Sequence, residues 1–391
     1  VKWYTLDFNI SKNNKIINKK VYKKFINLFK DSLSFRLNAD VELGALVSGG
    51  LDSSSIVSFL SKIRPEYKTQ TFSMVYNEPE YSEKSFIDSL VKELNLKSKI
   101  ITYKPSDYFK QLDKIIWHND LPTVGRSISP HFNIYKNIDS KRYKVILEGQ
   151  GADEYMAGYG NFHLAYLCEL LNKFKIMSFM IEYLQFRKTR RGSFFSDIKA
   201  IFQYNYPNFY KRFKKTNPHN KMFEFNNIKK VQFINREQNN LKSIFESRFK
   251  ILRSILHSVD RISMSSSIET RVPFLDHNLV EYVTSLPFNY LIKDGVRKSI
   301  LRDSMKDYLP DEIFNRKEKV GFSSPENIWF QHQLRNSFVK EVESAIQLPF
   351  VNEVQVLAKL DDFMNKKTKL DKSLIRLINF NRWIKIFKIK I

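Results

Sequence analysis

Short apolar runs bounded by polar turns recur along the first 160 residues, at 41–47, 69–76, 98–103 and 143–147. Runs of this length, flanked by glycine and polar residues, are typical of buried strands. Helix-like stretches separate them, so that strand and helix alternate. Such alternation predicts an α/β fold with a parallel, doubly wound, Rossmann-like sheet and right-handed crossovers.

The rest of the chain is expected to be mostly helical. In the lysine- and asparagine-rich lead, apolar side chains recur at helical spacing and predict an amphipathic helix near 22–35. We divide the chain into residues 1–38, a linker and lead helix, and residues 39–391, one large domain. Three parts are expected within that domain: the alternating core at 39–160, a helical, basic and aromatic insertion at 161–250, and a helical part contacting substrate and phosphate at 251–391.

Composition excludes several classes of protein. The hydrophobic content of 42% over 391 residues suits a globular chain. No apolar run is long enough to span a bilayer and the polar start is not a signal peptide, so no membrane partner is expected. The single cysteine, Cys168, excludes a disulfide framework and a multi-thiolate metal site. It lies in an apolar, helix-like stretch and is expected to be buried, which fits a cytoplasmic protein.

The net charge of +24 raises the question of a nucleic-acid partner. Basic and aromatic residues interleave most densely at 186–227, a pattern that can bind single-stranded nucleic acid. The same pattern arises when an insertion packs its aromatic rings on the core and leaves its lysines in water. No zinc-finger, homeodomain or RNA-recognition motif frames the segment, so we expect no nucleic-acid partner. A basic surface still favours anionic ligands such as ATP.

The most informative stretch, at residues 44–54, reads Gly-Ala-Leu-Val-Ser-Gly-Gly-Leu-Asp-Ser-Ser. It follows the first predicted strand and precedes a helix expected to open at 55–60. Strand, glycine turn and helix together aim backbone N–H groups and a helix N-terminus at a phosphate. The candidate phosphate-binding residues are Ser48, Gly49, Gly50 and Ser53, and Asp52 is a candidate metal ligand. The alternative is an ordinary tight turn; a Walker A loop is excluded because no Gly-Lys-Ser/Thr follows.

A second glycine-broken turn, Glu-Gly-Gln-Gly-Ala-Asp-Glu at residues 148–154, directly follows the predicted strand at 143–147. Ligands of open α/β sheets bind just past the carboxyl ends of the strands, so both turns are able to face one pocket. Asp153 would then complete a magnesium site with Asp52. In the alternative interpretation, Asp153 and Glu154 cap and begin a helix, a role that is compatible with the first.

Three further segments complete the pattern. Residues 258–276 end in Arg-Val-Pro-Phe-Leu-Asp, residues 295–302 read Gly-Val-Arg-Lys-Ser-Ile-Leu-Arg, and residues 309–322 include Leu-Pro-Asp-Glu-Ile and Asn-Arg-Lys. The loop at 44–54 resembles the Ser-Gly-Gly-x-Asp-Ser loop of the ATP pyrophosphatase (PP-loop) families. The five segments together resemble the C-terminal synthetase domain of the glutamine-hydrolysing asparagine synthetases, in the same order and over most of the chain.

This resemblance implies an ATP- and magnesium-dependent ligase that adenylates a carboxylate, most simply that of aspartate, and forms an amide with ammonia. The adenosine would bind beside Ser73 and Met74, and Val47, Met74, Glu148 and Gly149 would line the nucleotide. Lys298 matches the family's phosphate-binding lysine, although its pattern also suits a solvated helix lysine. The catalytic set implied is Gln150, Lys298 and Asp153.

One residue departs from the family pattern. Where this chain has Gln150, asparagine synthetases usually carry a glutamate tied to aspartyl-adenylate formation. Glutamine keeps the size and hydrogen-bonding capacity of that residue but cannot accept a proton as a base. Either the nearby Glu148 compensates, or the carboxylate or amine is not the usual one, as in lasso-peptide cyclases and β-lactam synthetases. A non-catalytic nucleotide-binding homologue is the further alternative.

The chain begins with valine and lacks the N-terminal cysteine nucleophile of the family's glutaminase domain. Residues 3–6, Trp-Tyr-Thr-Leu, resemble the linker that follows this domain. We therefore expect a fragment of a longer protein, with a glutaminase domain as partner, rather than a stand-alone synthetase. A homodimer stays open as the assembly.

Overall fold

A computed structural model describes residues 6, 18–65, 69–122, 128–189, 193–205, 222, 241–316 and 324–391. Its centre is a five-stranded sheet in the order β3-β2-β1-β4-β5, with every neighbouring pair parallel. The strands are β1 (Glu42–Leu46), β2 (Gln70–Val75), β3 (Lys97–Thr102), β4 (Tyr143–Leu147) and β5 (Glu269–Arg271). The predicted parallel α/β sheet is therefore confirmed, and four strands lie within one residue of their predicted ends.

The fifth strand was not predicted, because three residues are too few to leave a period-two pattern in a segment expected to be helical. It pairs with β4 through Val145, Ile146 and Leu147 and extends the sheet beyond the core at 39–160. A second small sheet, the antiparallel hairpin of β6 (Ile292–Lys293) and β7 (Val296–Arg297), was also missed.

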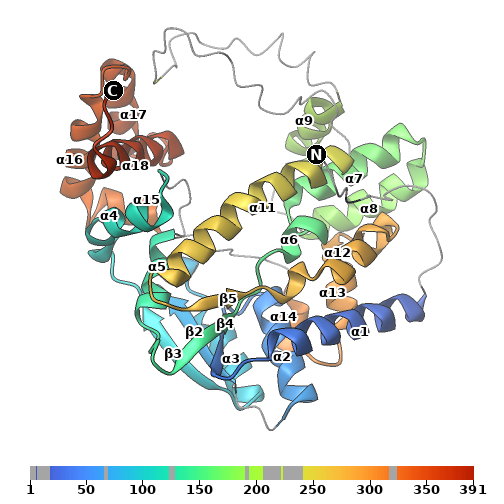
Figure 1. Ribbon diagram of the computed structural model, residues 1–391. Coiled ribbons are helices and arrows are strands. Elements are labelled where there is room, and N and C mark those ends of the chain that lie inside the picture. The colour runs from blue at the N-terminus through green and yellow to red at the C-terminus, as the bar shows by residue number, and fades with distance from the viewer. Residues whose placement is uncertain are drawn as a thin grey trace, which may run out of the picture.

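Alternate residues of the strands feed hydrophobic clusters on the two faces of the sheet. Ala45 and Val47 pack with α1 (Lys19–Arg36), α2 (Leu51–Ile63) and α3 (Lys84–Glu93), while Leu46 packs with α4 (Asp107–Asn119) and α5 (Ile128–Lys136). Figure 1 shows α2 and α3 beside the sheet and α11 crossing above it. Both faces are covered, as a parallel sheet requires.

The lead helix is confirmed. α1 begins after Asn18, whose side chain accepts a hydrogen bond from the backbone N–H of Lys20, and it buries Phe25, Phe29 and Leu33. These side chains pack against α12 and α13, so the helix joins the main core of the domain.

The remaining helices form two groups on either side of α11 (Leu241–Met264), as Figure 1 shows. The first group consists of α6 (Ala152–Tyr155), α7 (Gly160–Asn172), α8 (Ile176–Thr189), α9 (Phe194–Asn205), α12 (His277–Thr284), α13 (Ser299–Ser304) and α14 (Asp311–Asn315). The C-terminal group packs on α4 and consists of α15 (Glu326–Gln331), α16 (Arg335–Ile346), α17 (Glu353–Met364) and α18 (Lys372–Phe387).

Cys168 is fully buried in α7, as predicted, and burial raises the pKa of its thiol to about 12. Of the basic and aromatic segment at 186–227, residues 190–192, 206–221 and 223–227 lie outside the described residues. Within the described part of the chain, no helix combines the length and the apolar character needed to cross a membrane.

Candidate active site

The first loop connects β1 to α2 and is closed by its own serines. The backbone N–H of Ser48 donates to Ser53 Oγ at 3.2 Å, and that of Gly50 donates to Ser48 Oγ at 3.3 Å. The helix begins at Leu51, four residues earlier than predicted, so Asp52 lies in its first turn. No side chain caps this helix at Gly50, and its N-terminus lines a pocket at the carboxyl end of the sheet.

The second loop follows β4 and lies directly against the first. A Cβ on Gly149 would stand 2.9 Å from the backbone nitrogen of Ser53, which is closer than real Cβ atoms approach, and 3.0 Å from Cβ of Asp52. Glycine at this position therefore allows the two loops to meet. They do so where β1 neighbours β4, the point at which the chain's strand order reverses and ligands of such sheets bind.

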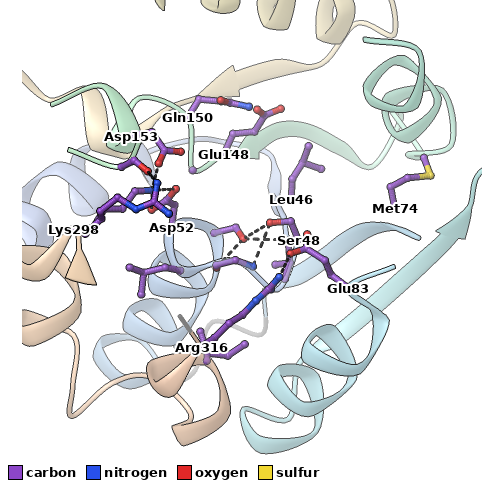
Figure 2. Close-up of a pocket in the computed structure, with 18 of the residues that line it drawn as sticks. Leu46, Ser48, Asp52, Met74, Glu83, Glu148, Gln150, Asp153, Lys298 and Arg316 are labelled. Atoms are coloured by element: carbon purple, nitrogen blue, oxygen red, sulfur yellow. Dashed lines mark hydrogen bonds and ion pairs between the residues drawn. The ribbon is translucent and has the colours of Figure 1, made fainter. Parts of the chain in front are cut away.

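Lys298 joins the two loops. Its ammonium lies 2.6 Å from Asp52 Oδ2 and 2.7 Å from Asp153 Oδ1. Figure 2 shows the three side chains pointing toward one another. The lysine is only 6% exposed, so the alternative of a solvated helix lysine is wrong. Burial would lower the pKa of Lys298, but the Asp153 and Asp52 carboxylates outweigh it and raise that pKa. The hairpin β6–β7 delivers this residue to the pocket immediately before α13.

The pair of Asp52 and Asp153 fits the expected role in magnesium binding. Two carboxylates converge on one cation here, and Mg²⁺ is usually held by one or two carboxylates together with water and substrate phosphates. No cluster of three or more His, Cys, Asp or Glu side chains able to hold a metal is found among the described residues. A magnesium ion at this point would therefore depend on phosphate or water oxygens for its other ligands.

Three arginines that were not predicted add positive charge to the pocket lining: Arg297, Arg302 and Arg316. Arg297 donates to the carbonyl of Gly158 at 2.9 Å, and Arg302 donates to that of Arg316 at 2.9 Å. Burial lowers the pKa of Arg297 and of Arg302. All three lie in the segments 295–302 and 309–322, which carry the family resemblance. Their position in those segments could have identified them as site residues.

Arg316 ties the first loop to α3. Its guanidinium donates to the carbonyl of Gly49 at 2.9 Å, pairs with Glu83 at 2.5 Å and stacks over Phe86 at 4.0 Å. The guanidinium group thus fixes the glycine turn that is expected to meet phosphate.

Glu148 is held by a buried polar network that was also missed. His131 Nε2 lies 2.8 Å from Glu148 Oε1, and the Tyr135 hydroxyl donates to the same oxygen. Tyr135 also contacts Thr270 Oγ1 of β5 at 2.7 Å. Burial would raise the pKa of Glu148, but His131 and the hydrogen bonds from Tyr135 and Gln150 lower it; Glu148 in turn raises the pKa of His131 against the effect of burial.

Apolar side chains also line the pocket, among them Leu46, Phe72, Met74 and Ile134, and Figure 2 shows Met74 on the opposite side of the view from Lys298. Of the thirteen residues predicted for the site, the following eleven line the pocket: Val47, Ser48, Gly50, Asp52, Ser53, Met74, Glu148, Gly149, Gln150, Asp153 and Lys298. Ser73 and Gly49 do not. Ser73 is buried on the opposite face of β2 from its neighbours Phe72 and Met74, because successive strand side chains point in opposite directions.

The pocket therefore combines an apolar end with a polar end rich in N–H donors, two carboxylates and several cations. That pattern suits a nucleotide, whose base is apolar in outline and whose phosphates are anionic.

Comparison with known proteins agrees with this geometry. The family model described as asparagine synthase matches residues 24–385. The chain is 25% identical to asparagine synthetase [glutamine-hydrolyzing] 1 of Bacillus subtilis, over 93% of this chain and 59% of the relative. It is 25% identical to the rat asparagine synthetase, over 83% and 48%, and 21% identical to amidase chyE of Penicillium rubens, over 76% and 52%. The chain thus spans about half the length of the curated relatives it matches. The family match covers most of the chain, which therefore belongs to the asparagine synthase family.

Proposed function

We propose that this chain is an ATP-dependent ligase that activates a carboxylate as its adenylate and converts it to an amide. The observation that carries the proposal is the meeting of Asp52, Asp153 and Lys298 where the two glycine-containing loops touch. A protein that only bound a nucleotide would have little use for a buried cation between two carboxylates at the phosphate end of the pocket.

The nucleotide is proposed to lie with its base toward Met74 and its phosphates toward the first loop. Ser48, Gly50 and Ser53, with the N-terminus of α2, would bind the pyrophosphate portion. Asp52 and Asp153 would hold magnesium, which neutralises phosphate charge. The roles of Val47, Gly49, Ser73 and Gly149 at the nucleotide remain predictions.

In the first step, a carboxylate oxygen attacks the α-phosphorus, the bond from that phosphorus to the bridging oxygen breaks, and pyrophosphate leaves. Lys298 would stabilise the negative charge that grows on the departing pyrophosphate. In the second step, the nitrogen of ammonia attacks the acyl carbon, AMP leaves with the acyl C–O electron pair, and the nitrogen loses a proton. Gln150 is proposed to position the acyl group by hydrogen bonds, because an amide is not a base.

Aspartate and ammonia are the simplest substrates, in keeping with the names of the Bacillus and rat relatives. A glutaminase domain elsewhere in the protein would supply the ammonia. A cytoplasmic location, a homodimer, and the division at residue 38 and within 39–391 are further parts of this proposal that await tests.

The test is pyrophosphate release from ATP and magnesium, with aspartate and ammonium supplied, for the wild type and for Asp52→Ala. We expect release that depends on aspartate and falls about 100-fold or more in the variant, as for loss of a charge-stabilising group at a phosphoryl centre. Binding of ATP without aspartate-dependent release would exclude asparagine synthesis.

A different carboxylate is the second candidate, favoured by Gln150 and by the relative named as an amidase. In that case aspartate would not stimulate pyrophosphate release. Another carboxylate, such as that of a peptide or a lactam precursor, would stimulate it instead.

A further inference from the structure

Glu148 stands at the end of β4, where its backbone N–H donates to the carbonyl of Arg271 in β5 at 2.9 Å. The side chain is 2% exposed and still contributes to the pocket lining. The reaction proposed above gives this carboxylate no chemical role, although the fold surrounds it with hydrogen-bond donors from two elements.

The donors around Glu148 fix both its orientation and its charge. His131 and Tyr135, one turn apart on α5, stack at 5.5 Å between ring centroids and direct their polar atoms to the same Oε1. Gln150 lies beside this carboxylate and helps to lower its pKa, and Thr270 holds the Tyr135 hydroxyl from β5. An ionised carboxylate accepts about four hydrogen bonds, so the two donors His131 and Tyr135 leave acceptor capacity toward the pocket.

The other carboxylates on the described pocket lining pair with a lysine or an arginine, whereas Glu148 pairs with the imidazole of His131. Asp52 and Asp153 hold Lys298, and Glu83 holds Arg316. Figure 2 shows Glu148 beside Gln150, on the opposite side of the view from Arg316. At this end of the pocket, the neutral Gln150 brings no charge of its own, so Glu148 sets the local preference for a positively charged group.

We propose that Glu148 binds an ammonium group of a substrate, either that of the incoming amine or that of an amino acid carrying the reactive carboxylate. This inference rests on the proposed function, since it assigns a ligand chemistry within the same pocket. His131 and Tyr135 are positioning residues: they hold the carboxylate rigid, so that it does not reorganise when the cation arrives. A hydrogen bond between an ionised pair in a desolvated site is strong, because the local dielectric is low.

The decisive variant is Glu148→Gln, which keeps the shape and removes the charge. Its matched control is Glu154→Gln, because Glu154 is a buried carboxylate six residues away that accepts a hydrogen bond from Tyr159 and does not line the pocket. ATP–pyrophosphate exchange is measured with aspartate and with succinate, which lacks the ammonium group. Amide formation is then measured against ammonium concentration, and exchange is compared for ATP and 2′-deoxyATP.

Loss of a hydrogen bond to a charged group corresponds to about a tenfold change or more in specificity. If the ammonium group belongs to the carboxylate substrate, Glu148→Gln lowers the preference for aspartate over succinate by about that factor. If it belongs to the amine, the KM for ammonium rises by that factor, and the preference for aspartate stays. Either outcome, with Glu154→Gln close to the wild type, supports the site and identifies its ligand.

Three results would overturn the inference. In a folded Glu148→Gln variant with normal ATP–pyrophosphate exchange, the preference for aspartate over succinate and the KM for ammonium could both change by less than about threefold. That result would contradict the ammonium site and leave the proposed function intact. A selective loss of discrimination between ATP and 2′-deoxyATP would assign Glu148 to the ribose instead. Absence of carboxylate-dependent exchange in the wild type would overturn the proposed function and the ammonium site with it.

Discussion

Glu182 in α8 accepts a hydrogen bond from the backbone N–H of Gly295, 3.0 Å away, three residues before Lys298. The same carboxylate oxygen lies 3.0 Å from His163 Nε2 in α7, and both side chains are buried. The turn of the hairpin also packs directly on α8, because a Cβ on Gly295 would stand 2.5 Å from the carbonyl carbon of Gln185. Helices α7 and α8 therefore support the residue that joins the two loops of the pocket.

This relationship predicts that Glu182→Ala lowers activity as well as stability. The change leaves the Gly295 N–H and His163 without their carboxylate, at a cost of about 1–3 kcal/mol in the free energy of unfolding. The change also removes a contact that holds the β6–β7 hairpin. A displacement of Lys298 by about 1 Å would slow ATP–pyrophosphate exchange up to about 100-fold. Glu182→Gln keeps an acceptor for Gly295 and should retain most activity. Urea unfolding and exchange assays on both variants test this; equal exchange in the alanine variant and the wild type would contradict it.

A second prediction concerns Gly158, which lies against the ion pair of Asp153 and Lys298. A Cβ at this position would stand 1.8 Å from Asp153 Oδ1 and 2.4 Å from Cε of Lys298. Gly158→Ala must therefore displace one or both charged groups, and we expect exchange to fall about 100-fold. Gly160→Ala is the matched control, since its Cβ would come no closer than 3.8 Å to Arg297 Nη1. Similar losses in the two variants would show that the effect is not specific to the ion pair.

In the Lys298→Met variant, the thermal midpoint of unfolding should depend more strongly on magnesium than in the wild type. Without the ammonium, Asp52 and Asp153 lose the cation that they share in a buried site, which costs about 3–5 kcal/mol of stability. A divalent cation that binds the folded state would restore part of this loss, as RT ln(1 + [L]/Kd). The measurement is the thermal midpoint with and without magnesium. Lys293→Met serves as control, because Lys293 lies in the same hairpin and pairs at 3.4 Å with the half-exposed Asp303. Equal magnesium shifts in both variants would exclude a cation site at the two aspartates.

Most of the sheet and of the site followed from local sequence. Buried strands such as 143–147 are continuous apolar runs, and the glycine turns after them mark where a ligand binds, so both loops were found from residues a few positions apart. The strand Glu269–Arg271 was missed because it owes its existence to pairing with β4 rather than to any pattern of its own.

Contacts between distant segments were the part that sequence could not give. His131 and Tyr135 recur at i and i+4, a spacing shared by countless surface and core pairs, and only the fold brings them to Glu148. Lys298 shows the same limit in reverse: its neighbours in sequence suit an exposed helix, whereas its partners lie 246 and 145 positions earlier in the chain. Its left-handed backbone, with φ of 56°, is likewise imposed by the hairpin before it.

The buried pair of His131 and Glu148 predicts a window of pH in which it stabilises the fold most. The pKa of His131 is raised above its ordinary value of 6.5, so its contribution is complete below that value and is lost as pH rises through the folded-state pKa. The pKa of Glu148 is lowered below 4.5, so its contribution is complete above that value and is lost as pH falls through the folded-state pKa. Both contributions are therefore present together between pH 4.5 and 6.5.

The double variant His131→Gln/Glu148→Gln replaces the pair by neutral side chains of similar size. Its deficit in free energy of unfolding relative to the wild type should be largest near the middle of that window and smaller on either side, by about 1.4 kcal/mol for each unit by which a folded-state pKa departs from the unfolded one. Urea unfolding across this range measures the deficit. His257→Gln is the control, because His257 contacts the backbone carbonyl of Asn119 at 3.0 Å rather than a carboxylate. A deficit that stays constant with pH would mean that His131 and Glu148 do not form an ion pair in the folded protein. The argument that Glu148 is ionised in the pocket would then fail.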